Sequence, residues 1–224
     1  MNKFIVSISG SDNSGKSTQL KMLHTKYPNI FSKPLHITQS PSYPKNVDPL
    51  AFSKWWFTKE NARDMVTLMI KSMKERNEYA LNDCKCPIIL YDRDDASYEN
   101  KTLSALLVMN FSFDEANKLI NEVKAELNYN NYNIEDLRIY IKTSNKHCKI
   151  KDDENKNSYN PSLYARHMVT TSVLDKYTLK NNNYTFVQYV DGEIDLINDQ
   201  IFNIIMKNAK NQVKLEKDEN EPIQ

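Results

Sequence analysis

The chain has 224 residues, of which 40% are hydrophobic and 26% charged, and its formal net charge is +1. These values are ordinary for a globular protein, and the length suits one α/β core, which excludes the disordered and fibrous classes. A nearly neutral chain has no overall field to attract nucleic acid or an anionic membrane, so neither is an expected partner. No apolar run reaches the roughly 20 residues of a membrane helix, and the odd number of cysteines leaves no second pair to complete a zinc site. We therefore expect a soluble, cytoplasmic protein with reduced thiols.

Apolar and β-branched runs predict the strands of the chain, and apolar residues at helical spacing predict the helices between them. The strands are expected at Lys3–Ser9, Leu35–Thr38, Pro87–Asp92, Leu137–Lys142 and Tyr184–Asp191. The helices are expected at Gly15–Tyr27, Asn61–Leu81, Phe113–Leu127, Leu163–Leu179 and Leu196–Met206. Because strands alternate with helices, we predict an α/β fold with a doubly wound, five-stranded parallel sheet and helices on both faces. Residues 1–206 would form this single domain, and residues 207–224 a polar, flexible tail.

The first predicted strand leads directly into a match to the phosphate-binding pattern G-x-x-x-x-G-K-[ST]. The matching residues, with the threonine that follows them, are Gly10, Ser11, Asp12, Asn13, Ser14, Gly15, Lys16, Ser17 and Thr18. Glycine at both ends allows the chain to wrap around phosphates, and the backbone N–H groups and the next helix N-terminus then face the anion. Lys16 should reach the β- and γ-phosphates of ATP, and the Ser17 hydroxyl should bind Mg²⁺.

The third predicted strand ends in Asp92, which is followed by Arg93. An acidic residue at the carboxyl end of a strand beside the phosphate-binding loop can hold Mg²⁺ and its water shell. The adjacent arginine can bind a phosphate through two parallel hydrogen bonds. A surface turn rich in charge is the alternative interpretation of the same residues.

In their order and spacing, several segments over about residues 3–206 resemble the thymidylate kinase family. These segments are Ile8–Leu20, Asn61-Ala62-Arg63, Asp92-Arg93-x-x-x-Ser97, Ile134–Leu137 and Val190-Asp191-Gly192. The resemblance implies a kinase that uses ATP and Mg²⁺ to phosphorylate a nucleoside monophosphate, with dTMP converted to dTDP. It also leaves a homodimer open as the assembly.

The resemblance assigns roles to individual residues. Asp12 would face the sugar hydroxyl of the acceptor, Arg93 would bind its phosphate, and Arg63 would hydrogen-bond the edge of its base. Asp92 would lie beside the metal ion. The family stacks an aromatic side chain on the base, and Phe57 is the nearest candidate for that contact in this sequence.

The chain departs from the family at the arginines that stabilise the transition state. Asn13 stands where one family type has an arginine in the loop, and the predicted lid, at about residues 146–161, contains no arginine. Arg166, just after the lid, is the best remaining candidate to neutralise charge, with a surface salt bridge as its alternative role. Arg76 is expected on a solvated helix face, and Asp94 takes the place of a family tyrosine.

Two other functions remain open from the sequence. A deoxynucleoside kinase would use the same loop, but it needs a carboxylate base near the sugar 5′-hydroxyl, and no glutamate stands at the predicted strand ends near the loop. A degenerate nucleotide-binding protein with weak turnover would agree with the missing arginines. The cluster Trp55-Trp56-Phe57 could line a base pocket or belong to the core, and the four histidines are expected to be structural or exposed.

Overall fold

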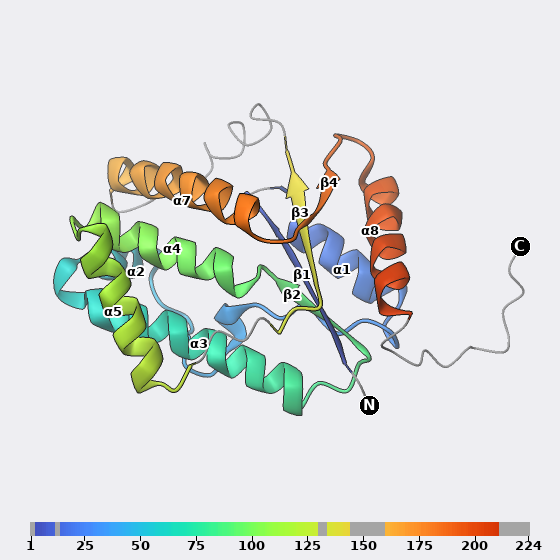
Figure 1. The fold of residues 1–224 in the computed structure, drawn as a ribbon, viewed down its shortest axis with the longest axis horizontal. Coiled ribbons are helices and arrows are strands. Elements are labelled where there is room, and N and C mark those ends of the chain that lie inside the picture. Colours follow the sequence, from blue (N-terminus) through green and yellow to red (C-terminus); the bar gives the residue numbers. More distant parts are fainter. Residues whose placement is uncertain (1–2, 12–13, 130–133, 144–159, 211–224) are drawn as a thin grey trace, which may run out of the picture.

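The computed structural model describes residues 3–11, 14–129, 134–143 and 160–210 (Figure 1). In chain order its first elements are β1 (Phe4–Gly10), α1 (Lys16–Lys26), the 3₁₀ turn η1 (Ile37–Gln39), α2 (Pro49–Trp56), the 3₁₀ turn η2 (Lys59–Asn61) and α3 (Ala62–Asn82). They are followed by β2 (Ile88–Asp92), α4 (Asp95–Val108), α5 (Phe113–Glu126), β3 (Leu137–Lys142), α7 (Pro161–Asn181), β4 (Thr185–Gln188) and α8 (Ile194–Ala209). This order confirms the predicted α/β class.

The strands form one parallel sheet in the order β2-β1-β3-β4. Because β1 lies between β2 and β3, Ile8 pairs with Asp92 on one side and Gly10 with Ile141 on the other. In a parallel sheet all carboxyl ends lie at the same edge. The strand order therefore brings the loop that follows β1 beside the end of β2, where Asp92 lies.

The prediction of a fifth strand at Leu35–Thr38 is wrong, because the described part of the chain forms a four-stranded sheet. Residues 31–35 run beside β2 but make only isolated bridges to it. The Ser32 hydroxyl accepts the N–H of Leu90 at 3.0 Å, which is a position that a strand carbonyl would take in a regular ladder. Pro34 has no N–H with which to continue the ladder, and the chain then turns into η1.

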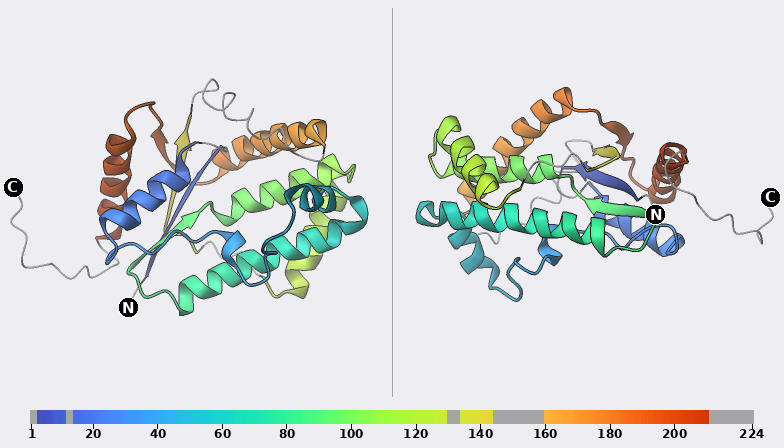
Figure 2. Two further views of the ribbon diagram at one scale, coloured as in Figure 1. Left: turned by 180° about the vertical axis from the view of Figure 1, so that it is seen from behind. Right: turned by 60° about the horizontal axis from the view of Figure 1, so that its bottom comes forward.

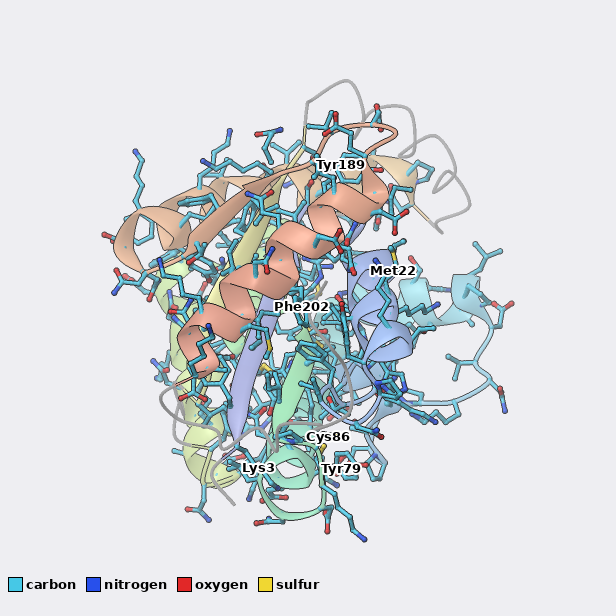
Figure 3. All side chains as sticks on the ribbon, turned by 90° about the vertical axis from the view of Figure 1, so that its right-hand side faces the viewer. Lys3, Met22, Tyr79, Cys86, Tyr189 and Phe202 are labelled. Carbon is cyan, nitrogen blue, oxygen red and sulfur yellow. The ribbon has the colours of Figure 1, made fainter. Side chains whose placement is uncertain are left out.

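One face of the sheet is apolar and is covered by α1 and α8 (Figure 1, Figure 2). Its core contains Phe4, Val6, Ile8, Leu20, Leu23, Ile88, Leu90, Ile139, Ile141, Val187, Ile197, Ile201 and Ile205. Phe202 of α8 (Figure 3) stacks on Tyr27, with the ring centroids 4.4 Å apart. The Asn198 amide of α8 donates to the Gln19 side chain of α1 at 2.9 Å. This apolar half fixes α1, the helix that begins at the phosphate-binding loop, against the sheet.

The opposite face of the sheet packs against α3 and α4, with a small apolar cluster around Ile5 and Ile89 and polar side chains nearer the carboxyl ends of the strands. Ser7, Ser9 and Tyr91 are buried on it. Arg76 of α3 lies over Tyr91, its guanidinium carbon 3.8 Å from the ring centroid, and forms a buried ion pair with Asp95 of α4. The expectation that Arg76 lies on a solvated helix face is therefore wrong, because α4 covers that side of α3.

The helices predicted from apolar spacing, which are α1, α3, α5, α7 and α8, are confirmed with small shifts at their ends. α8 continues to Ala209, so the predicted domain end at 206 falls inside a helix, and residues 211–224 of the predicted tail lie outside the described residues. Helices α2 and α4 were not expected. α4 packs against both α5 and α7, so its apolar residues form no single stripe. Among the described helices, none combines the length and apolar composition needed to cross a bilayer.

The buried ion pair gives a stability prediction. Arg76→Gln leaves the carboxylate of Asp95 unbalanced at a site where the two side chains are only 2% and 10% exposed, so the free energy of unfolding should fall by about 3–5 kcal/mol. Arg63→Gln is the matched control, because Arg63 pairs with Glu122 and Glu126 at a half-exposed surface and should cost less than about 1 kcal/mol. Urea denaturation measures both variants. Equal losses for the two would contradict this account of the buried pair.

Candidate functional site

The phosphate-binding loop follows β1 and has glycine where its backbone requires it. Gly10 has a φ of 152°, and a Cβ there would lie 2.7 Å from a carbonyl oxygen of β3. Gly15, just before α1, has a φ of 81°, which glycine adopts at low cost. A Cβ on Gly15 would meet the Tyr189 ring at 3.0 Å. Asp12 and Asn13, which were predicted to bind nucleotide, lie outside the described residues.

The Lys16 side chain is folded back into this loop. Its ammonium donates to the Ser11 carbonyl at 2.6 Å and to the Ser14 hydroxyl at 3.2 Å, and only 5% of the residue is exposed. Ser17 and Thr18 are exposed in the first turn of α1, where backbone N–H groups lack helical partners and can face an anion. The loop therefore holds an ammonium group close to a helix N-terminus.

Ser17 and Asp92 form the contact on which a metal site would be built. Ser17 Oγ donates to Asp92 Oδ2 at 2.7 Å across the neighbouring strand ends. Hydroxyl and carboxylate oxygens are the hard ligands that Mg²⁺ prefers, and protein sites for Mg²⁺ often supply only one or two of them beside phosphates and water. The donor set fits Mg²⁺ bound together with a nucleotide.

Arg93 lies in the turn between β2 and α4, with a φ of 76° that is uncommon for a residue other than glycine. Its N–H donates to the Ile8 carbonyl at 3.1 Å, and its Nη1 donates to the Gly10 carbonyl at 2.8 Å. Its own carbonyl accepts a hydrogen bond from Arg76 Nη1 at 2.8 Å. Backbone held in a sparsely populated region by its surroundings is concentrated at functional sites. These bonds hold the buried guanidinium against the first residue of the loop.

Asp94, where the resembling family has a tyrosine, is a fully buried helix cap. Its Oδ1 accepts the N–H of Ser97 at 2.7 Å, and its Oδ2 accepts the Tyr184 hydroxyl at 2.6 Å. Its N–H donates to Ser9 Oγ at 3.2 Å. The carboxylate of Asp94 therefore ties the first turn of α4 to the segment before β4, while the backbone N–H of the same residue contacts β1.

A pocket of about 480 Å³ opens beside the carboxyl end of β2, between α2, α3, α4 and α7. Its lining is rich in rings and comprises His36, Ile37, Thr38, Tyr43, Pro49, Phe52, Ser53, Trp56, Phe57, Met69, Tyr98, Lys101, Tyr164 and His167. Tyr98 connects this pocket to the metal-site strand, because its hydroxyl donates to the Asp92 carbonyl at 2.7 Å. Small-molecule pockets of about 300 to 1,000 Å³ with apolar walls and a few polar groups are typical binding sites. The size and the aromatic lining suit a nucleobase.

A second cavity of about 600 Å³ lies between residues 33–41 and the C-terminal half of α3. Its described lining includes Arg76 and Tyr79 but no residue of the phosphate-binding loop. The aromatic pocket, which shares Tyr98 with the strand end, is therefore the better acceptor site.

The structure brings only some of the predicted acceptor residues to the aromatic pocket. Phe57 lines it, in edge contact with His167 at 5.3 Å between ring centroids. The aromatic cluster serves both proposed roles, since Trp56 also lines the pocket while the cluster packs on the helical core. Arg63 is not in the lining. The first turn of α3 faces α5, where Arg63 pairs with two glutamates, so its position does not support the predicted contact with the base, which stays a prediction.

Arg166 is likewise not where its predicted catalytic role requires. It is exposed on α7, whereas Met168 and Asp175 of the same helix line a small cavity beside Arg93. Two residues along a helix correspond to opposite sides, so Arg166 faces away from this cavity. The predicted lid at residues 146–161 lies almost wholly outside the described residues.

Three polar residues of the site were missed by the sequence interpretation. His36 and Lys101 line the aromatic pocket, and Lys101 and Asp175 line the small cavity of about 60 Å³ beside Arg93. None of the three belongs to a motif. Spacing was the available signal for Lys101, because it lies one helical turn after Ser97 of the Asp-Arg-x-x-x-Ser run.

The burial of His36 predicts a pH dependence of stability. Burial lowers the pKa of His36 from 6.5 to about 4, with Asp92 opposing and Arg93 reinforcing the shift. Between these pH values the unfolded chain binds a proton that the folded chain does not, so stability should fall as the pH drops from 6.5 to about 4. His36→Gln removes this contribution. The Tm of the variant should therefore fall less than that of the wild type over this range, and parallel Tm curves would contradict the assignment.

Comparison with known proteins places the fold. No protein-family model and no curated protein sequence matches the chain. The deoxyadenosine kinase from M. mycoides with bound dATP superposes with a TM-score of 0.63 at 16% identity, covering 90% of this chain and 99% of that one. The same kinase with bound dCTP gives a TM-score of 0.56 at 16% identity, covering 89% and 100%. The thymidylate kinase from Candida albicans superposes with a TM-score of 0.54 at 18% identity, covering 100% of this chain and 97% of that one. The chain therefore has the α/β fold of these kinases.

Proposed function

We propose that the chain transfers the γ-phosphate of ATP to a nucleoside monophosphate, with dTMP as the preferred acceptor. The observation that carries this proposal is the link that Tyr98 makes between the aromatic pocket and the residues expected to bind Mg²⁺ and ATP. Tyr98 lines the aromatic pocket and hydrogen-bonds the carbonyl of Asp92, whose carboxylate contacts Ser17 of the phosphate-binding loop. A base held in that pocket has its sugar directed toward the donor phosphates.

On the donor side, Lys16 exchanges its contacts in the loop for oxygens of the β- and γ-phosphates. Ser17 and Asp92 would hold Mg²⁺, which would neutralise charge on the phosphates. The loop N–H groups and the α1 N-terminus orient the triphosphate. Phosphoryl transfer asks the protein mainly for positioning and charge stabilisation, and these residues supply both.

On the acceptor side, Arg93 binds the acceptor phosphate. An oxygen of that phosphate forms the new bond to the γ-phosphorus as the bond to ADP breaks. Since this oxygen is already anionic, the step needs no general base. A nucleoside 5′-hydroxyl, by contrast, must lose a proton. The buried guanidinium of Arg93, held beside the loop by Gly10, suits the charged acceptor.

A deoxynucleoside kinase is the second candidate, and one observation favours it. Asp175 of α7 places a carboxylate in the small cavity with Arg93, and burial raises the pKa of that carboxyl group. A carboxylate with a raised pKa is suited to accept the proton of a 5′-hydroxyl. The kinases with the same fold act on deoxyadenosine and on thymidylate by name, so their likeness supports both acceptor classes.

The donor assignment is tested by Lys16→Ala. Loss of the ammonium group removes charge from the β- and γ-phosphates, so turnover should fall by at least about a hundredfold. Circular dichroism checks that the variant is folded. Near-normal turnover in a folded Lys16→Ala protein would refute the phosphate-binding role. Wild-type protein that binds ATP but phosphorylates no acceptor would indicate the degenerate nucleotide-binding protein instead.

The acceptor assignment is tested by kcat/KM for dTMP, thymidine and deoxyadenosine, measured side by side. We expect dTMP to be the best substrate. Arg93→Ala should raise the KM for dTMP and lower kcat, because it removes a charge-assisted contact, while the KM for ATP changes little. A better rate with a nucleoside, abolished by Asp175→Asn and spared by Arg93→Ala, would establish the deoxynucleoside kinase.

A further inference from the structure

We propose that Lys101 recognises the acceptor phosphate and selects a nucleoside monophosphate over a nucleoside. This inference rests on the proposed function and names a specificity-determining residue for it. Lys101 belongs to no motif of the sequence. It supplies, within the described chain, a second cation for the acceptor besides Arg93.

The position of Lys101 is the first observation. It lines the aromatic pocket together with Tyr98 and Phe57, and it also lines the small cavity together with Arg93 and Ser11 of the phosphate-binding loop. Lys101 is therefore common to the lining of both cavities. An acceptor whose base fills the aromatic pocket must pass its 5′ end through this junction to reach the donor phosphates.

The helix that contains Lys101 is fixed in place near the sheet edge. The cap at Asp94 holds the first turn of α4 to β1, and the Ser97 hydroxyl lies 3.2 Å from the Ser9 hydroxyl. Residues four apart on a helix share a face, so Lys101 projects from the same side as Ser97, one turn farther from the sheet. The ammonium group is thus held at the junction by a rigid element.

The charge in the small cavity is the second observation. Arg93 and Lys101 contribute two positive charges and Asp175 at most one negative charge to its lining. The Asp175 carboxylate accepts a hydrogen bond from the Asn100 amide at 2.9 Å, which holds it toward α4. Burial raises the pKa of the Asp175 carboxyl group against the opposing effects of the Asn100 hydrogen bond and of Arg93 and Lys101. A carboxyl group with a raised pKa repels an anion less, because it is protonated more readily. Among the described residues of its lining, positive side chains therefore outnumber negative ones where a phosphate dianion would arrive.

The test compares Lys101→Met and Lys101→Arg with Lys118→Met as the matched control, because Lys118 lies on α5 with 78% of its side chain exposed. Calorimetric titration measures dTMP and thymidine binding, and initial rates give the KM for dTMP and for ATP. Lys101→Met should weaken dTMP binding roughly tenfold to a hundredfold while thymidine and ATP change by less than about twofold. Lys101→Arg should restore most of the dTMP affinity, and Lys118→Met should match the wild type.

Equal weakening of dTMP and thymidine by Lys101→Met would overturn the inference, because it would indicate a structural or sugar-binding role. Unchanged dTMP binding would overturn it as well. Lys101→Gln, which keeps a polar side chain without the charge, replaces the methionine variant if the latter does not fold. Wild-type turnover decides the proposed function separately. If the wild type phosphorylates dTMP and the Lys101 variants bind dTMP normally, only the present inference fails.

Discussion

The buried ion pair of Arg76 and Asp95 is the contact on which the site side of the molecule depends. Arg76 touches three elements at once: β2 through the Tyr91 ring, α4 through Asp95, and the strand-end turn through the Arg93 carbonyl. A charged pair out of water is held only where its remaining hydrogen-bonding groups are satisfied, and Asn77 donates to the second carboxylate oxygen of Asp95 at 2.9 Å. The unusual backbone of Arg93 persists because this network over-determines it.

The electrostatics of the site follow from the charged side chains that this network and the carboxyl edge of the sheet bring together. In the proposed arrangement Lys16 serves the donor side, in the loop after β1, and Arg93 and Lys101 serve the acceptor side, after β2 and on α4. The Asp92 carboxylate is already committed to Ser17. Charges fixed before the substrates arrive need no reorganisation during the reaction, which is how protein sites stabilise a transferring phosphoryl group.

The sequence predicted the features that depend on local spacing, and it failed where packing between distant segments decides. The phosphate-binding loop and β3 follow from patterns of adjacent residues. The prediction of a fifth strand failed because Pro34 interrupts the ladder of hydrogen bonds. The proline was a local signal against a strand, but the short apolar run after it was given more weight. The prediction of a solvated position for Arg76 failed because helical periodicity indicates one buried face, whereas α3 is buried on two sides. Lys101 and Asp175 line one cavity although they lie on helices far apart in the sequence. No sequence motif contains both residues, so their proximity could not be predicted from a motif.

The two faces of the sheet differ in a way that bears on how such a chain can change. The face beneath α1 and α8 is held by aliphatic and aromatic packing, and that kind of core accepts exchanges of similar volume. The face beneath α3 and α4 adds to its apolar contacts a network of directed hydrogen bonds and charges near the site, in which each partner restricts the next. Substitutions can therefore accumulate on one side while the other resists them. A chain divided in this way can retain its architecture and its charged centre while most of its residues are replaced.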